Sequence, residues 1–124
     1  MRREIHEAKA YIEGRDEVAK LIRERSRCYE LEGFWLERED ALKLLELLDR
    51  HGARVLGGDV ALKKESGLEL SGDNWQCGDE ARRKTIDFSR EYVRSYPDAN
   101  ALFHIVWKDA IGRYEDLMKR RGGG

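Results

Sequence analysis

Apolar and polar residues follow each other along this chain with two periods, one typical of helices and one typical of strands. Between residues 40 and 51 the apolar residues recur at the spacing of one helix face, and Gly52 follows as a C-terminal stop. The apolar stripe consists of Ala41, Leu44, Leu45 and Leu48. Residues 101–107 read Ala-Leu-Phe-His-Ile-Val-Trp, an almost continuous apolar run that is typical of a central strand. We therefore expect a helix over 40–51 that packs across a sheet containing residues 101–107.

Weaker patterns extend the alternation of helices and strands to the rest of the chain. We expect a charged helical segment over 1–30, a helix that opens at Asp79 and stops before Pro97, and a last helix after Asp109. Short strands are expected at residues 33–36, 53–56, 60–63 and 67–71. The fold class is α/β (α+β), a single domain with a mixed sheet of four or five strands packed with helices. The domain spans residues 1–121, with a core over 33–107, a C-terminal helix over 108–121, and a flexible tail over 122–124.

Composition limits the classes of protein to which the chain can belong. It has 124 residues, of which 40% are charged and 40% hydrophobic, as in one globular domain. No apolar run approaches the roughly 18 residues of a membrane span, and no apolar signal segment follows Met1. We expect a cytoplasmic protein with no membrane partner. Its two cysteines, Cys28 and Cys77, make neither a disulfide framework nor a zinc set.

The net charge of −1 conceals an uneven distribution of charge. Residues 30–80 carry thirteen acids and six bases, whereas residues 1–29 have a net charge of +2 and residues 81–124 one of +4. No general basic surface is indicated, so we expect no nucleic-acid partner. An acidic middle region suits a surface that meets a basic partner, and acids scattered over a solvated surface explain the same count.

The stretch Gly57-Gly58-Asp59 is the most unusual local pattern. A phosphate-binding glycine loop leads from a strand into a helix, but here the strand-like residues Val60-Ala61-Leu62 follow. We therefore predict a structural role, in which Gly57 or Gly58 has positive φ or lies too close to a neighbouring backbone for a side chain. Asp59 and Asp73 have no metal-ligand spacing and are interpreted as turn carboxylates, so no metal or other cofactor is expected.

Four further residues leave chemical alternatives open. Cys77 lies just before a predicted helix, where the helix dipole lowers a thiol pKa, and His104 with an aspartate would complete a nucleophilic triad. A buried, inert cysteine and a strand histidine held by the core are the simpler interpretation. Trp35 and Trp75 flank loops, where tryptophan serves either the core or an interface.

The pieces that carry a resemblance are Phe34-Trp35-Leu36, the leucine-rich helix, Val55-Leu56-Gly57-Gly58-Asp59-Val60 and Asp73-Asn74-Trp75-Gln76-Cys77. Together they resemble the GGDV and DNWxC core of the immunity protein 40 family, over about residues 33–107. Members often carry an aromatic residue where this chain has Ala61, and tyrosine where it has Gly72. The resemblance implies an antidote from a bacterial polymorphic toxin system, which binds the C-terminal domain of its cognate toxin and catalyses nothing.

The resemblance and the charge pattern lead to a hypothesis for the binding surface. We expect partner contacts from Asp59, Asp73, Asn74, Trp75 and Trp35, with Gly57 and Gly58 holding the structure. The protein is expected to be a monomer or a homodimer. Two alternatives remain: a small cysteine-dependent enzyme that uses Cys77 with His104, and an accessory domain that oligomerises through its N-terminal segment.

Overall fold

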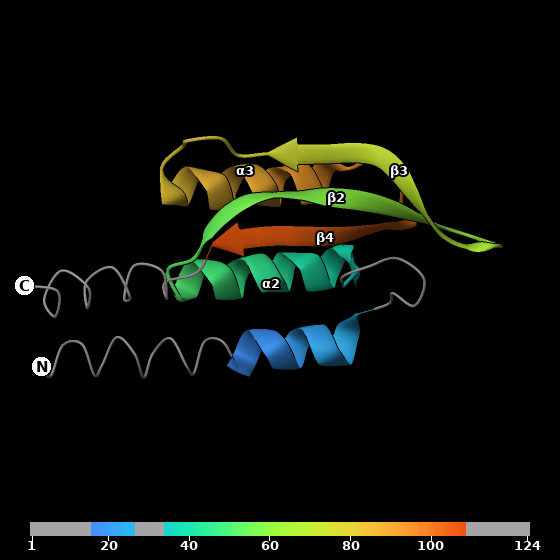
Figure 1. Ribbon diagram of the computed structural model, residues 1–124, viewed down its shortest axis with the longest axis horizontal. Coiled ribbons are helices and arrows are strands. Elements are labelled where there is room, and N and C mark those ends of the chain that lie inside the picture. Colours follow the sequence, from blue (N-terminus) through green and yellow to red (C-terminus); the bar gives the residue numbers. More distant parts are fainter. Residues whose placement is uncertain (1–15, 27–33, 109–124) are drawn as a thin grey trace, which may run out of the picture.

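Four strands and the helices beside them make up residues 16–26 and 34–108, which are the residues that the computed structural model describes (Figure 1). Residues 16–25 are helical. The elements that follow are β1 (Leu36–Glu37), α2 (Arg38–Arg50), β2 (Arg54–Lys64), β3 (Gly67–Gln76), α3 (Arg82–Ser95) and β4 (Ala101–Lys108). The predictions for residues 1–15, for Cys28 and for the segment after Lys108 lie outside the described residues.

The strands form one sheet in the order β1-β4-β2-β3, and each neighbouring pair is antiparallel. β4 therefore lies inside the sheet, as its apolar run predicts, and β3 lies at an edge. β2 and β3 are joined by a tight turn after Lys64 and pair as an antiparallel hairpin. The single α/β domain and its strand number are thus confirmed, whereas the sheet of the described residues is antiparallel rather than mixed.

Several boundaries differ from the sequence prediction. β1 lies at Leu36–Glu37 rather than at 33–36, and β3 continues to Gln76 rather than ending at residue 71. Asp59 and Asp73, interpreted as turn carboxylates, therefore lie within β2 and β3.

Two further differences concern β2 and α3. Residues 53–56 and 60–63 were expected as separate strands, but β2 runs without a break through Gly57 and Gly58. The register shifts between Val55 and Gly57 show why a glycine pair is tolerated there: it accommodates a bulge rather than a turn. The second difference concerns α3, which begins at Arg82 rather than Asp79, with Ala81 as its N-cap.

Helices α2 and α3 pack against one face of the sheet and enclose the main core. The leucine stripe of α2 is buried, and Val60, Phe103 and Ile105 meet it from the strands at 0–1% exposure. Because side chains alternate across a strand, the residues between them point to the opposite face. A second, small cluster of Trp35, Ala61 and Leu102 lies on that opposite face, with Leu68 against it.

Polar contacts fix the helices to each other and to the sheet. The Arg82 guanidinium donates to the Asp49 carboxylate at 3.1 Å and to the Ala53 carbonyl at 3.3 Å, which holds the start of α3 to the end of α2. The Arg38 guanidinium donates to the carbonyls of Tyr96 and Asp98 at 2.6 and 2.9 Å, beyond the end of α3. The helices of the described ranges include none that is both long and apolar enough to cross a membrane.

Candidate docking face

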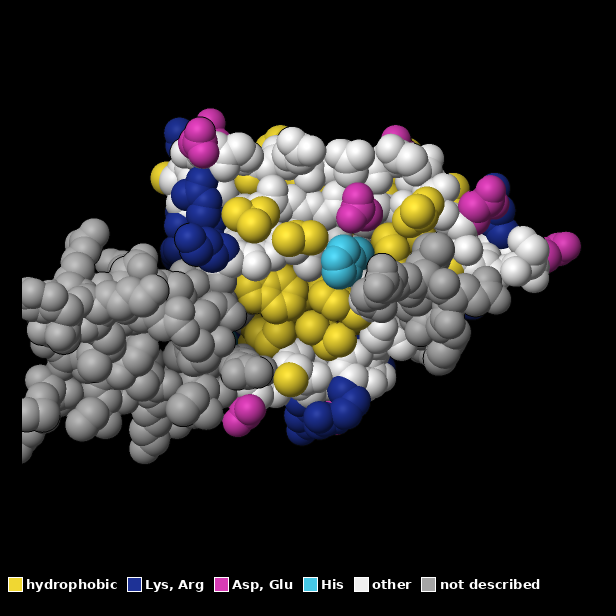
Figure 2. Space-filling model, in the orientation of Figure 1, with side chains coloured by type: hydrophobic (Ala, Val, Ile, Leu, Met, Phe, Trp, Pro, Cys, Tyr) yellow, Lys and Arg dark blue, Asp and Glu magenta, His cyan; other side chains and the backbone are white. Residues whose placement is uncertain are grey.

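The sheet face opposite the helices carries a shallow hollow of about 390 Å³. It is lined by Leu56, Gly57, Gly58, Asp59, Asn74, Trp75, Gln76 and Val106. Figure 2 shows hydrophobic side chains over β2 and β4 on this side, next to a histidine and an acidic side chain. We call this surface the open face, and define it by Leu56, Asp59, Asn74, His104 and Val106.

Gly57 and Gly58 line the hollow, and neither has room for a side chain. A Cβ on Gly57 would overlap with the main-chain oxygen of Trp75, and one on Gly58 would overlap with the Trp75 ring and the main-chain oxygen of His104. Gly57 also has a φ of 152°, which is rare for other residues. The close approach predicted for this glycine pair is therefore present, and it brings the three strands together under the hollow.

Asp59, Asn74 and His104 lie side by side on three neighbouring strands. Asp59 is the register partner of Asn74 on β3 and of His104 on β4. The Asp59 side chain is exposed and makes no ion pair or hydrogen bond with the described residues. His104 Nδ1 lies 3.0 Å from the Phe34 carbonyl, and because a carbonyl only accepts, Nδ1 is the protonated nitrogen. Within the described ranges, the pairing thus leaves the Asp59 carboxylate at the rim of the hollow without a neutralising base.

Asp73 lies outside the hollow, at an irregular point of the edge strand. β3 bulges opposite Val60, and Gly72 there has a φ of 85°. The Tyr96 hydroxyl donates to Asp73 Oδ2 at 2.6 Å, and the Asp73 N–H donates to Ser71 Oγ at 3.0 Å. The bond to Asp73 and partial burial raise the pKa of Tyr96 above its usual value. Asp73 therefore joins the edge of β3 to the end of α3.

Both candidate tryptophans are buried. Trp75 is 4% exposed, its Nε1 donates to Ser89 Oγ at 2.9 Å, and its ring stacks on Tyr92 with centroids 4.7 Å apart. Trp35 is 3% exposed and belongs to the small cluster beside His104, with ring centroids 5.6 Å apart. Of the two roles that the sequence leaves open, this burial favours the core for both side chains.

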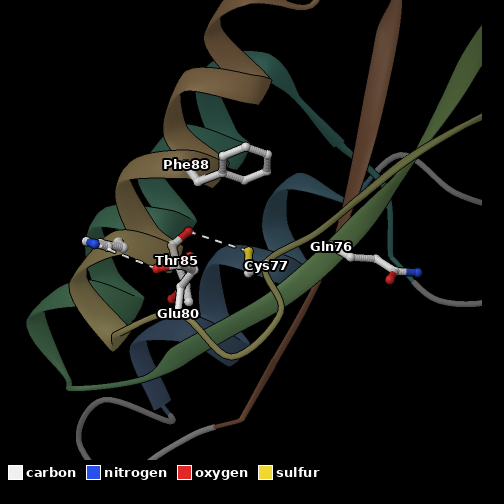
Figure 3. A pocket seen from close by; sticks show the side chains of 6 residues that line it. Gln76, Cys77, Glu80, Thr85 and Phe88 are labelled. Carbon is white, nitrogen blue, oxygen red and sulfur yellow. Dashed lines mark hydrogen bonds and ion pairs between the residues drawn. The ribbon is translucent and has the colours of Figure 1, made fainter.

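Cys77 and His104 are not brought together. Cys77 packs on the helix side, with Sγ 3.7 Å from the Thr85 carbonyl and 3.4 Å from Ser89 Oγ (Figure 3). His104 lies on the opposite face, between the buried residues Phe103 and Ile105. Cys77 and His104 are therefore not within hydrogen-bonding reach of each other and do not form a nucleophile–base pair. Among the described residues, no cluster of three or more His, Cys, Asp or Glu side chains is placed to hold a metal ion.

Sequence reasoning missed the apolar residues of the open face. Leu56 and Val106 are 44% and 40% exposed, and Leu70 on β3 is 58% exposed. Val106 lies within the apolar run of residues 101–107, where neighbouring positions on both faces of the strand are apolar. The sequence of this run therefore does not show which face of the strand is covered and which is open. Leu56 lies at the bulge, and the adjacent glycine pair is the signal that marks it.

Comparison with known proteins identifies the family. The family described as immunity protein 40 matches residues 27–107, which is more than half of the chain. No curated protein and no solved structure matched this chain. The match includes every residue of the open face and both helices that pack behind it. The chain belongs to the immunity protein 40 family.

Proposed function

We propose that this protein neutralises a cognate bacterial toxin by binding its toxin domain and covering the surface on which that domain acts. Family membership carries the proposal, because immunity proteins protect the cell that makes a toxin, and they are generally not enzymes. Steric occlusion needs a preformed surface and no chemistry from the protein that binds. We place the encounter in the cytoplasm, where the chain is made.

The open face has the properties that such a surface needs. Leu56 and Val106 expose apolar area on a sheet face that the described helices leave uncovered. Exposed apolar groups around a hollow resemble the centre of a binding interface, where a few anchoring side chains supply most of the free energy. Asp59 adds a carboxylate that a basic group of the toxin can neutralise. A stable interface buries about 800 Å² on each partner, so the surface around the hollow has to take part as well.

The charge distribution supports a basic partner, but fewer acids are free to meet it than the count of acids in residues 30–80 suggests. Several acids of residues 30–80 are paired with bases from the flanking regions, such as Asp49 with Arg82 and Arg83. Asp40 similarly lies 3.9 Å from Arg25. The acids that keep their charge exposed include Asp59 on the open face and Asp79 beyond β3. We expect these to steer association more than to add to final affinity.

The test is co-expression with the toxin domain encoded beside this gene. The wild-type chain should protect the cell, and Val106→Glu should abolish protection while leaving the melting temperature within a few degrees of wild type. Lys43→Glu is the matched control, since it changes an exposed residue on α2 away from the open face. Failure of the wild-type chain to protect or to bind would refute the proposal.

A second variant separates binding from catalysis. Cys77→Ser keeps the size of a side chain that is only 6% exposed and removes the thiol. We expect full protection from this variant, because no step depends on a nucleophile. Loss of protection by a stable Cys77→Ser protein would instead support the cysteine-dependent enzyme.

A further inference from the structure

The outer edge of β3 is unpaired in the described part of the chain. β3 bonds only to β2 and forms the outermost strand of the sheet in Figure 1. The Cys77 N–H donates to the Leu56 carbonyl at 3.0 Å, so the main-chain groups of Cys77 point toward β2. Because these groups alternate along a strand, the N–H and C=O groups of Gln76 and Asn74 point away from the sheet. They form a short row of free donors and acceptors.

A second hollow, of about 380 Å³, lies beside this edge. Gln76 and Cys77 border it from the end of β3, Glu80 from the loop, and Lys84, Thr85 and Phe88 from α3. Phe88 is 52% exposed, although it is a large apolar side chain on a charged helix. Figure 3 shows Phe88 and Thr85 on the α3 side, with Cys77 between them and the strand. A free strand edge beside a helix and a side-chain pocket is the arrangement that binds extended peptides by strand addition, and here Phe88 supplies an apolar wall of the pocket.

The charge of this edge is one-sided. Residues 65–80 contain five acids and no base, namely Glu65, Glu69, Asp73, Asp79 and Glu80. Two of them have exposed lysine partners, Glu69 with Lys64 at 3.0 Å and Glu80 with Lys84 at 3.8 Å. Exposed pairs of this kind hold their acids only weakly. The edge therefore favours a segment that carries lysine or arginine.

The same features disfavour pairing between two copies of this chain. Antiparallel pairing of two β3 strands would set Glu69 and Asp73 of one copy near the same acids of the other, and like charges opposite each other are destabilising. The bulge at Gly72 also interrupts the edge strand, between Leu70 and the free groups of Asn74 and Gln76. Bulges and charges on an edge strand are known devices against self-association.

We propose that an extended, basic segment of the toxin domain adds to the sheet as a fifth strand along Asn74–Gln76. One of its side chains occupies the hollow beside Phe88. The proposal rests on the proposed function and specifies how the partner is held: main-chain bonds supply affinity, and the acidic edge with its pocket selects the segment.

The experiment compares Gln76→Pro with Gln76→Ala, using calorimetric titration of the toxin domain encoded beside this gene. Proline removes the outward N–H and leaves the bonds to β2, whereas alanine removes only the side chain. We expect Gln76→Pro to bind at least tenfold more weakly than Gln76→Ala. Phe88→Ala should also weaken binding, and Asp79→Lys should weaken it most at low salt.

Each outcome decides a separate question. Equal affinity of the proline and alanine variants, with the wild type binding tightly, would overturn strand addition and leave the proposed function standing. No binding by the wild type would overturn both. If Gln76→Pro unfolds, hydrogen exchange of the wild-type amides decides: slower exchange at Asn74 and Gln76 in the complex supports the proposal, and unchanged exchange refutes it. A homodimer that Gln76→Pro dissociates would assign the edge to a second copy and also refute it.

Discussion

The two faces of the sheet use the same strands for different purposes. On the helix side, Val55 is fully buried and its N–H donates to Thr85 Oγ1 at 3.1 Å, at the point where the bulge shifts the strand register. On the open face, Val106 is 40% exposed and Asp59 makes no side-chain bond with the described residues. At these positions one face satisfies its apolar and polar groups within the chain, whereas the other leaves an exposed apolar side chain and a carboxylate without a partner among the described residues. Free groups of both kinds next to each other are typical of a surface that a partner completes.

The largest expected difference between the faces lies within β4. Phe103→Ala should lower the free energy of unfolding by about 3–5 kcal/mol, because it leaves a cavity in the core that the helices enclose. Val106→Ala should change it by less than about 0.5 kcal/mol, since this side chain already contacts solvent. Urea unfolding of both variants measures the contrast. Similar losses would mean that the open face is covered in the folded chain.

The glycine pair connects the two faces and gives the next largest effect. Gly58→Ala should cost about 3 kcal/mol, because the new Cβ would overlap with the Trp75 ring on the helix side and with a His104 backbone atom that the strand pairing holds. Gly52→Ala is the control: Gly52 has a φ of 77° but open space around it, so its cost should be about 1 kcal/mol. Equal costs in the same unfolding assay would show that β2 can move away from its neighbours.

The sequence predicts the covered face better than the open one. The leucine stripe of α2 and the apolar run of β4 each have one strong periodicity, and both elements form nearly where expected. The prediction of separate strands on either side of the glycine pair fails because local propensity alone does not show that Trp75 supplies the ring that packs over Gly58. That contact depends on the pairing of β2 with β3, which no local pattern encodes.

The candidate site was only partly accessible to sequence reasoning, for a related reason. Asp59 and Asn74 are fifteen positions apart, yet strand register makes them neighbours, and both face solvent. Asp73, adjacent to Asn74 in sequence, instead bonds to Tyr96 at the bulge. A two-residue irregularity in β3 therefore decides which acid lies beside the hollow, and irregularities of this kind come from tertiary packing.

The next prediction concerns affinity rather than stability. Asp59→Lys should leave the melting temperature nearly unchanged and weaken toxin binding about tenfold, which corresponds to about 1.4 kcal/mol. Most of the change should appear as slower association that depends strongly on salt, because a rim charge mainly steers the encounter. Stopped-flow association rates at low and high salt measure this. Glu46→Lys, on the exposed side of α2, is the control. If both variants slow association equally, the net charge of the protein steers the encounter, and Asp59 has no special role in it.

The smallest effect is expected at the boundary between the faces, where the Tyr96 hydroxyl donates to Asp73 at 2.6 Å. Tyr96→Phe should cost about 0.5 kcal/mol, because the bond is exposed and water competes for both partners. The same bond, followed by burial, raises the pKa of Tyr96 from 10.0, so the folded state favours the protonated phenol. Its stabilising contribution is therefore complete below pH 10 and is lost as the pH rises through the raised pKa.

The unfolding free energy measured between pH 8 and pH 11 tests this pH dependence, with Tyr96→Phe as the reference. Wild type and variant should differ at pH 8 and converge at the alkaline end, since the ionised phenol no longer donates and is repelled by the Asp73 carboxylate. Tyr92 also has a raised pKa, from burial and then from the Asp73 charge, and it remains in both proteins. No difference at any pH would show that the ring of Tyr96, packed edge-on against Phe103 with centroids 5.8 Å apart, stabilises the fold without help from its hydroxyl.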